Sequence, residues 1–251
     1  MIDFHAHILP DTDDGAVDII QTRKMLEEAR MAGFTDIIAT SHYKKEVFEL
    51  NEISRQNRIN IIDKIDNKVK LHIGSEIYIT KDLVNLIKDK KASSINNTRY
   101  VLFELPFRDN LLIFNSVIDD LKRNKLVPIL AHPERYEIVK NNPKIVEDWI
   151  KRGIYMQANY LSILDKYGKD ARKTLEILLK HNLIHFLGSD AHRPDNTYPK
   201  IAEATEKIKK IIGEDNFYKL SEENPRKVLN NEKIEILKTT EIKQSIFNKF
   251  K

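Results

Sequence analysis

Seven short apolar or β-branched segments recur along the chain, and the stretches between them are long enough for helices. The segments lie near residues 1–6, 36–40, 71–74, 100–104, 127–131, 154–157 and 184–188. Two of the intervening stretches carry apolar residues at helical spacing. These residues are Ile19, Ile20, Met25, Leu26 and Ala29 before Gly33, and Leu111, Phe114, Val117, Ile118 and Leu121 before Val127. Strands that alternate with helices build parallel sheets, so the pattern predicts an α/β fold with a parallel sheet or barrel.

Composition narrows the class of protein. The chain has 251 residues, 41% hydrophobic and 32% charged, which suits one domain spanning residues 1–251. The 42 basic and 38 acidic residues nearly balance, so the charge gives no support to nucleic-acid binding. The chain has no cysteine, which excludes disulfides, thiolate metal sites and cysteine nucleophiles.

The distribution of apolar residues gives no sign of a membrane protein. No apolar run approaches the roughly 18 residues that a membrane span needs. Met1 is followed directly by Ile-Asp-Phe-His, without the pattern of a signal peptide. We therefore expect a cytoplasmic protein that does not insert into a membrane.

The lysine-rich end of the chain, about residues 233–251, has a different character. Its apolar residues are Ile234, Ile236, Leu237, Ile242, Ile246 and Phe247. This pattern predicts an amphipathic terminal helix that packs against the body of the protein, with membrane or partner contact as the alternative.

His5 and His7 provide the first indication of chemistry. They stand two residues apart on the first predicted strand, and alternate side chains of a strand share one face. Two imidazoles on one face of a rigid element can bind the same metal ion.

Other potential ligands also fall at the ends of predicted strands. They are His42, Glu76, Glu104, His132, Asp190 and His192, and Asp13 and Asp14 follow the first strand. In a βα barrel the carboxyl ends of the strands face one mouth, so these sequence-distant groups are predicted to converge there. Carboxylates that converge repel one another, and metal ions are the natural compensation. Mixed histidine and carboxylate ligation favours Mn, Fe or Zn over Ca or Mg.

Less specific interpretations apply to several residues. His72, His181 and His185 stand outside any motif and are interpreted as capping or surface residues. One of Asp13 and Asp14 is expected to cap a helix beginning near Ala16, while the other binds metal. Arg193, Lys44 and Lys45 are either solvated or guide an anionic substrate. The guanidinium of Arg135, in His-Pro-Glu-Arg, is suited to bidentate phosphate binding, with a surface salt bridge as the alternative.

These motifs together resemble the PHP (polymerase and histidinol phosphatase) superfamily. Within it, the chain is most similar to bacterial metal-dependent protein-tyrosine phosphatases associated with capsule and exopolysaccharide synthesis. The resemblance covers about residues 1–230. It rests on Met-Ile-Asp-Phe-His-Ala-His-Ile-Leu-Pro, Asp-Thr-Asp-Asp-Gly-Ala, Ala-Thr-Ser-His-Tyr, Gly-Ser-Glu-Ile-Tyr, Phe-Glu-Leu-Pro, Ala-His-Pro-Glu-Arg-Tyr and Gly-Ser-Asp-Ala-His.

The resemblance implies a distorted (βα)7 barrel that holds three divalent metal ions, with Mn²⁺ as the first choice and Fe or Zn as alternatives. It assigns His5, His7, Glu76 and Asp190 to one ion; Glu76, Glu104 and His132 to a second; and Asp14, His42 and His192 to the third. It also implies phosphate binding by Arg135 and by a second arginine after Ser-Asp-Ala-His, for which Arg193 is the candidate.

The resulting hypothesis is hydrolysis of a phosphotyrosine monoester on a protein by a metal-bridging hydroxide, with Arg135 neutralising the developing charge. The resemblance implies a membrane-associated tyrosine kinase as the substrate, which would bring the enzyme near the inner membrane face. The alternatives are another PHP phosphoesterase, acting on histidinol phosphate or a nucleic-acid phosphodiester, and a binding module whose metals only stabilise the fold.

Overall fold

Strands and helices alternate along the computed structural model, which describes residues 1–66, 68–107, 111–235 and 238–242. The strands are β1 (Ile2–Ala6), β2 (Asp36–Ala39), β3 (His42–Tyr43), β4 (Lys70–Ile73), β5 (Glu76–Tyr78), β6 (Tyr100–Glu104), β7 (Val127–Ala131), β8 (Tyr155–Asn159) and β9 (Phe186–Gly188). The α-helices are α1 (Ile19–Met31), α2 (Glu52–Ile65), α3 (Leu83–Lys88), α4 (Phe114–Arg123), α5 (Glu137–Asn141), α6 (Ile145–Lys151), α7 (Lys169–Lys180), α8 (Ile201–Ile212), α9 (Glu214–Tyr218) and α10 (Asn224–Leu229). Short 3₁₀ turns span Ile95–Asn97, Pro133–Arg135, Tyr160–Leu164 and Tyr198–Lys200, and a π-helical turn spans Lys219–Glu223.

The strands form two parallel sheets, in the orders β1-β2-β4 and β3-β5-β6-β7-β8-β9. Every predicted strand segment contains a strand, but those at 36–40 and 71–74 are each followed by a further short strand, β3 and β5. A backbone hydrogen bond links the two sheets where these breaks occur, from Glu76 N at the start of β5 to the oxygen of Thr40 directly after β2 (2.9 Å). The residues after β9 are hydrogen-bonded to β1, with Asp190 N donating to His5 O at 2.8 Å. The parallel sheet is therefore curled.

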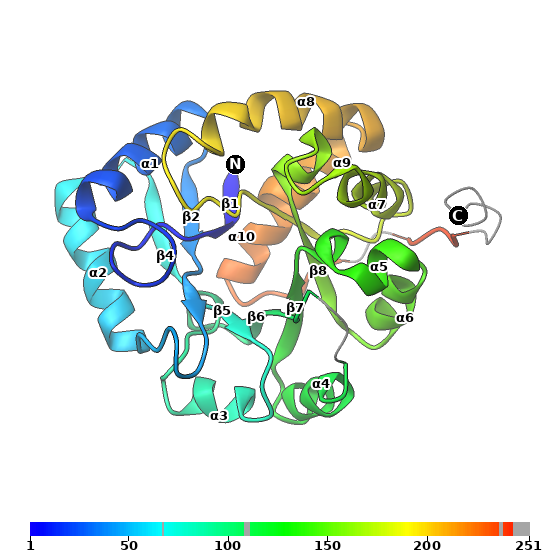
Figure 1. Ribbon diagram of the computed structural model, residues 1–251, viewed down its shortest axis with the longest axis horizontal. Coiled ribbons are helices and arrows are strands. Elements are labelled where there is room, and N and C mark those ends of the chain that lie inside the picture. The colour runs from blue at the N-terminus through cyan, green and yellow to red at the C-terminus, as the bar shows by residue number, and fades with distance from the viewer. Residues whose placement is uncertain (67, 108–110, 236–237, 243–251) are drawn as a thin grey trace.

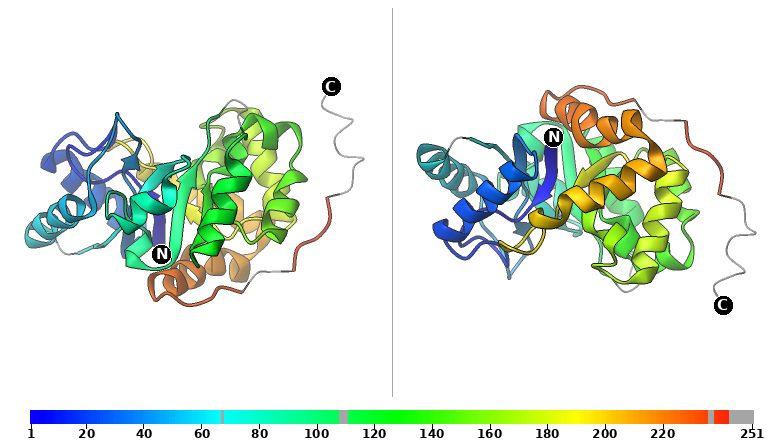
Figure 2. Two further views of the ribbon diagram at one scale, coloured as in Figure 1. Left: turned by 90° about the horizontal axis from the view of Figure 1, so that it is seen from below. Right: turned by 90° about the horizontal axis from the view of Figure 1, so that it is seen from above.

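Helices cover the outside of the curled sheet (Figure 1). Figure 2 shows α9 and α10 at the same end of the molecule as the N-terminus. There the amino group of Met1 lies 3.5 Å from Glu222, in the π-helical turn between these helices. The loops that follow the carboxyl ends of the strands belong to the other end, where the functional groups gather.

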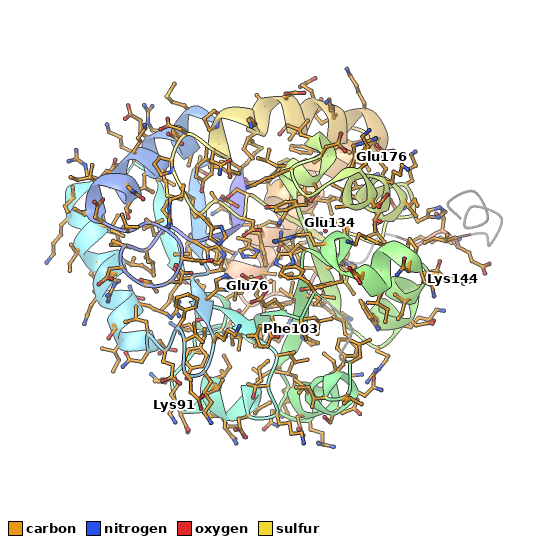
Figure 3. The ribbon with its side chains drawn as sticks, in the orientation of Figure 1. Glu76, Lys91, Phe103, Glu134, Lys144 and Glu176 are labelled. Atoms are coloured by element: carbon orange, nitrogen blue, oxygen red, sulfur yellow. The ribbon has the colours of Figure 1, made fainter. Side chains whose placement is uncertain are left out.

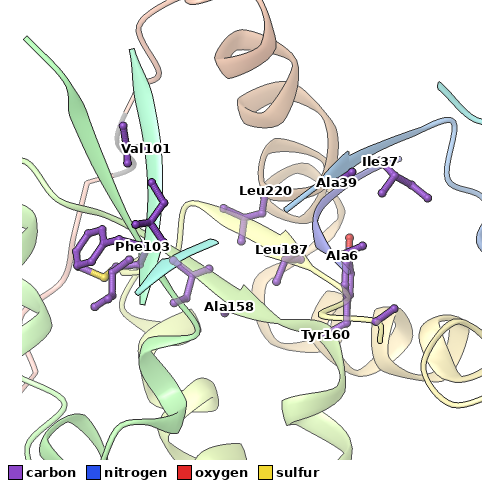
Figure 4. Packing of buried hydrophobic residues seen from close by; sticks show 14 of the residues in the cluster. Ala6, Ile37, Ala39, Val101, Phe103, Ala158, Tyr160, Leu187 and Leu220 are labelled. Carbon is purple, nitrogen blue, oxygen red and sulfur yellow. The ribbon is translucent and has the colours of Figure 1, made fainter. Parts of the chain in front are cut away.

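The core lies between the sheet and the helices, and Figure 4 shows part of it around Ala6, Ala39, Phe103 and Leu187. Every residue of β1, β2, β6, β8 and β9 is buried, as expected for parallel strands covered on both faces. The predicted apolar stripe of α4 is buried as expected. In α1 the expectation is wrong for Ile20, which lies outside the buried stripe of the helix and is 74% exposed.

The prediction of a terminal helix is wrong for the part of the tail that the structure describes. Residues 233–235 and 238–242 form no helix; Ile236, Leu237, Ile246 and Phe247 lie outside the described residues. The segment 238–242 is an extended strap, in which Thr240 N donates to His181 O and Ile242 N donates to Glu147 Oε1. Ile234 and Ile242 are buried, so the expected packing against the body is confirmed for these two residues.

A polar cluster at the start of β2 joins helix α10 to the sheet. Asp36, at the start of β2, accepts hydrogen bonds from His72 (2.8 Å) and from both terminal nitrogens of Arg226 on α10 (3.1 and 3.2 Å). Burial opposes ionisation of Asp36, but the hydrogen bonds from His72, Arg226 and Thr35 hold its pKa well below the usual range. Asp36 therefore binds its proton less readily in the folded chain than in the unfolded chain.

We expect Asp36→Asn to lower the free energy of unfolding by about 2 kcal/mol at pH 7, or about 6 °C in Tm. A carboxyl whose pKa is depressed by folding stabilises the protein above its unfolded pKa and loses that effect as the pH falls. The difference between wild type and variant should shrink below about pH 4. Thermal denaturation of both proteins from pH 7 to pH 3 measures this difference, and a constant difference would contradict the assignment.

Candidate metal centre

All nine predicted ligands converge at the carboxyl ends of the strands. Their nitrogen and oxygen atoms form four overlapping groups, and within each group these atoms lie within 4.8 Å of one another. The groups are His7, Asp14, His42 and His192; His5, His7 and Asp190; His5, Glu76 and His132; and His42, Glu76 and Glu104. Figure 3 labels Glu76, which belongs to two groups and lies near the middle of the molecule in that view. The convergence predicted from strand ends is therefore present in the structure.

The hydrogen bonds made by the Nδ1 atoms of His5 and His7 leave their two Nε2 atoms facing each other. His5 Nδ1 donates to Gln157 Oε1 at 2.8 Å, and His7 Nδ1 donates to Asp13 Oδ2 at 2.7 Å. Whenever one of these rings is neutral, its proton is then on Nδ1 and its Nε2 carries a lone pair; the two Nε2 atoms are 3.0 Å apart. Glu76 Oε2 lies 3.1 Å from one Nε2 and 3.3 Å from the other. These atoms need positive charge among them, and a metal ion can supply it in place of protons on the imidazoles, so the donor set fits a metal ion.

Glu76 is the central carboxylate of the cluster. One oxygen, Oε1, lies 2.8 Å from His132 Nε2, and the other, Oε2, lies 3.1 Å from His42 Nδ1. Burial alone would raise the pKa of Glu76, but the charges of His5, His42 and His132 hold it well below the usual range. Glu76 thus stays ionised, with two oxygens that face different histidines, as a ligand that bridges two ions requires.

Glu104 has the opposite behaviour. Burial and the negative charge of Glu76 raise the pKa of Glu104 well above its usual value. Its Oε1 lies 3.4 Å from His42 Nδ1. Two buried carboxylates in one cluster cannot both ionise cheaply without added positive charge, which is a second indication that the cluster is suited to cations.

Asp190 divides its two oxygens between different partners. Oδ2 accepts hydrogen bonds from Arg135 Nη1 (2.8 Å), Asn159 Nδ2 (2.8 Å) and Tyr167 OH (3.1 Å). Oδ1 faces the histidines, 3.5 Å from His7 Nε2. Burial alone would raise the pKa of Asp190, but its hydrogen bond with His7 and the nearby positive charges keep it well below the usual range. Oδ2 is thereby held in place, and Oδ1 points toward the histidines with which it would bind an ion.

Two predicted ligands have an unusual backbone conformation, and a glycine lets two strands of the site lie close together. His132 and Asp190 have φ angles of 35° and 50°, in the left-handed region that non-glycine residues seldom adopt. Gly188 permits the close approach of β9 to β1, because a Cβ at this position would lie 2.6 Å from the Cβ of His5. The unusual backbone conformations directly after β7 and β9 therefore belong to two residues of the cluster.

Three supporting residues were missed from the sequence: Gln157, Asn159 and Tyr167. Gln157 and Asn159 belong to β8, the one predicted strand whose carboxyl end supplied no candidate. The rule applied to the other strands would have drawn attention to them. The capping prediction for Asp13 or Asp14 is wrong, since α1 begins at Ile19 and Asp18 caps it by accepting from Gln21 N. Asp13 instead orients His7 and accepts from His42 N.

Asp13→Asn should weaken metal binding by about 10- to 100-fold, the usual cost of removing the partner of a metal-binding histidine. The amide can present a donor to His7 Nδ1, which disfavours the tautomer that leaves Nε2 free. Titration of the metal-free protein with Mn²⁺ by calorimetry measures the change. Asp18→Asn is a matched control, since asparagine caps a helix as well as aspartate does; equal Mn²⁺ affinity of both variants would contradict the role of Asp13.

Arg193 and the three histidines outside the motifs do not belong to the ligand cluster. Arg193 Nη1 donates to the backbone oxygens of Asp14 and His192, and Arg193 is not among the residues that line the cavity above the cluster. His181 contacts the tail, with its Nδ1 3.0 Å from the oxygen of Thr240. His72 and His185 are buried elsewhere, so the expectation that they lie on the surface is wrong. These three histidines lie outside the four ligand groups.

A cavity of about 610 Å³ opens onto the cluster. Arg135 lies in its wall, with its guanidinium 4.7 Å from the ring centre of Phe107 and 4.2 Å from that of Tyr167. Lys44 also lines the cavity, with Nζ 4.6 Å from the ring centre of Tyr78. A substrate in this cavity would meet the ligand cluster at the bottom and aromatic rings and cations at the sides.

Fold and site together define a class of α/β protein that gathers histidines, carboxylates and an arginine at the carboxyl ends of a curled parallel sheet. Residues 1–230 match the family described as capsular polysaccharide synthesis, CpsB/CapC, and the chain belongs to this family. The resemblance found in the sequence motifs is thereby confirmed.

Individual proteins agree with this assignment. Tyrosine-protein phosphatase CpsB of Streptococcus agalactiae serotype V is 31% identical over 241 residues, which cover 92% of this chain and 99% of that protein. A structure from a study of YwqE from Bacillus subtilis and CpsB from Streptococcus pneumoniae, described as unique metal-dependent tyrosine phosphatases, has a TM-score of 0.89 at 30% identity and covers 97% of this chain and 100% of that chain. Histidinol phosphate phosphatase of Lactococcus lactis, solved with zinc, L-histidinol and phosphate, has a TM-score of 0.57 at 19% identity over 84% of this chain and 93% of that chain, a likeness of fold.

Among the residues that the structure describes, no helix combines the length and the apolar character required to cross a bilayer.

Proposed function

We propose that the protein is a metal-dependent tyrosine-protein phosphatase that hydrolyses phosphotyrosine monoesters on proteins. The observation that carries the proposal is the pair of facing Nε2 atoms of His5 and His7 beside Glu76, below a cavity whose wall contains Arg135. Membership of the CpsB/CapC family supports the same activity. The chain is proposed to form a single PHP-type phosphatase domain with a distorted (βα)7 barrel.

The cluster is proposed to hold three divalent ions, with Mn²⁺ as the first choice and Fe or Zn as alternatives. The ligands would be His5, His7, Asp14, His42, Glu76, Glu104, His132, Asp190 and His192. When bound, divalent ions supply Lewis acidity toward phosphoryl oxygens and make water a better nucleophile near neutral pH.

The residues of the chain bind and orient the substrate. Arg135 has donors besides the one given to Asp190, and these bond to no other described residue, so they can reach phosphoryl oxygens. The rings of Phe107 and Tyr167 contact its guanidinium and restrict its movement. Phe48 and Tyr78, which also line the cavity, offer apolar surface to the tyrosine ring of the substrate. The phenolate of tyrosine is a fair leaving group, which makes the demand for a general acid modest.

The protein substrate is proposed to be a membrane-associated bacterial tyrosine kinase that regulates capsular or extracellular polysaccharide synthesis. Membership of a capsular polysaccharide synthesis family supports this partner. A cytoplasmic enzyme would meet such a kinase at the inner face of the membrane without inserting into it.

The test compares substrates before and after removal of metal. Chelation should abolish turnover of a phosphotyrosine peptide, and Mn²⁺ should restore it. Histidinol phosphate, a phosphoserine peptide and single-stranded DNA serve as competing substrates. The proposal is wrong if one of them is turned over faster than the phosphotyrosine peptide, or if a folded, metal-free His5→Ala, His7→Ala double variant keeps full activity.

A further inference from the structure

Lys166 is a cation of the cavity wall that the sequence did not single out. It follows the 3₁₀ turn Tyr160–Leu164 and lies in the loop between β8 and α7, at the same end of the sheet as the ligand cluster. The only hydrogen bond of its ammonium group among the described residues runs from Nζ to Thr197 Oγ1, at 3.0 Å. A lysine ammonium has three donors, so two remain for a ligand or for water.

The Lys166 ammonium and the Arg135 guanidinium share one aromatic ring. Lys166 Nζ lies 5.3 Å from the ring centre of Tyr167, and the guanidinium carbon of Arg135 lies 4.2 Å from it. The hydroxyl of Tyr167 is fixed by its hydrogen bond to Asp190. The ring is therefore anchored to a predicted ligand and contacts both cations.

The two cations differ in how they are neutralised. Arg135 pairs with Asp190 at 2.8 Å, whereas within the described residues no carboxylate lies within salt-bridge distance of Lys166. Partial burial lowers the pKa of Lys166; the negative charge of Asp190 opposes this, and the positive charges of Arg135 and Lys200 add to it. A bound anion between Lys166 and Arg135 would relieve the repulsion.

Arg193, the second arginine suggested by the family resemblance, is engaged elsewhere. Its Nη1 donates to two backbone oxygens, of Asp14 (2.6 Å) and His192 (2.9 Å), and it does not line the cavity. It therefore holds the loops that carry two predicted ligands.

We infer that Lys166 is the second phosphate-binding cation of this chain and acts beside Arg135 on the phosphoryl group of the substrate. The inference rests on the proposed phosphatase function and names a residue of the same site. A lysine contributes a point charge that interacts with any oxygen of a phosphate dianion, and the fork of Arg135 fixes the orientation. Because the ground state and the transition state both carry this charge, Lys166 contributes mainly to binding.

The test measures binding of inorganic phosphate to the Mn²⁺-loaded protein by calorimetry, alongside turnover of a phosphotyrosine peptide. Lys166→Met should weaken phosphate binding by about tenfold and raise KM by a similar factor, with kcat changed by less than about threefold. Lys166→Arg should restore most of the affinity. Lys169→Met, which removes an exposed lysine at the start of α7, is the matched control and should behave as wild type.

The outcomes separate this inference from the proposed function. Equal phosphate affinity of Lys166→Met and wild type overturns the inference, even if the peptide is turned over. A larger loss of phosphate affinity in Arg193→Met than in Lys166→Met, at equal metal content, also overturns it. If wild type does not turn over the phosphotyrosine peptide but Lys166→Met still loses phosphate affinity, the proposed function fails and the assignment of Lys166 stands.

Discussion

Glu76→Gln is expected to reduce turnover of a phosphotyrosine peptide by more than about 100-fold. Loss of a residue that only supports a metal ligand costs up to about 100-fold, and loss of a ligand itself should cost more. Glu76 contacts four histidines of the cluster, and its two oxygens face different ones. The amide is neutral and presents one acceptor in place of two, so a bridge between two ions is lost. Elemental analysis should show fewer bound ions per chain than in wild type.

A matched control for this change is Glu206→Gln, which alters an exposed glutamate on α8 away from the cavity. It should keep wild-type activity and metal content. Circular dichroism should show the same helix content in both variants. Full activity of folded Glu76→Gln protein with unchanged metal content would falsify the bridging role of Glu76.

Arg135→Met should lower kcat/KM for the same peptide by about 100- to 1,000-fold, comparable to loss of a donor that stabilises developing charge. The metal content should stay at the wild-type level. Asp190 would lose one donor but keep Asn159 and Tyr167, so its free oxygen remains in place. Steady-state kinetics and elemental analysis on one preparation separate the two effects.

Arg135→Lys should fall between wild type and Arg135→Met, since lysine keeps the charge but loses the fork and the stacking between Phe107 and Tyr167. Arg123→Met, an exposed position on α4, should have no effect. A change in kcat/KM of less than about threefold in Arg135→Met would remove Arg135 from the site.

The order of elements was predictable because hydrophobic patterning is local. The apolar runs and the stripe of α4 reveal strands and helices without knowledge of the rest of the fold. Two features depend on tertiary packing instead. The breaks at Thr40 and Gly74 occur next to the hydrogen bond from Glu76 N to Thr40 O that joins the two sheets, and the segment 238–242 is held by backbone hydrogen bonds to His181 and Glu147.

The ligand cluster was predictable for a related reason. A side chain such as His5, Glu104 or Asp190 needs only its place at the carboxyl end of a strand to be directed to the common mouth. The predicted roles of Asp13 and Arg193 depended on distances between loops. The loop after β1 directs Asp13 to His7, and the loop after β9 directs Arg193 to backbone oxygens.

The sequence by itself determined the alternation of elements, the set of residues at the strand ends and the family. Only the tertiary structure decided which groups support them: Asp13 and Gln157 on the histidines, Asn159 and Tyr167 on Asp190, and Lys166 beside Arg135. The physical reason is that periodicity and strand position are properties of neighbouring residues, whereas these hydrogen bonds join residues as far as 152 positions apart once the sheet has curled.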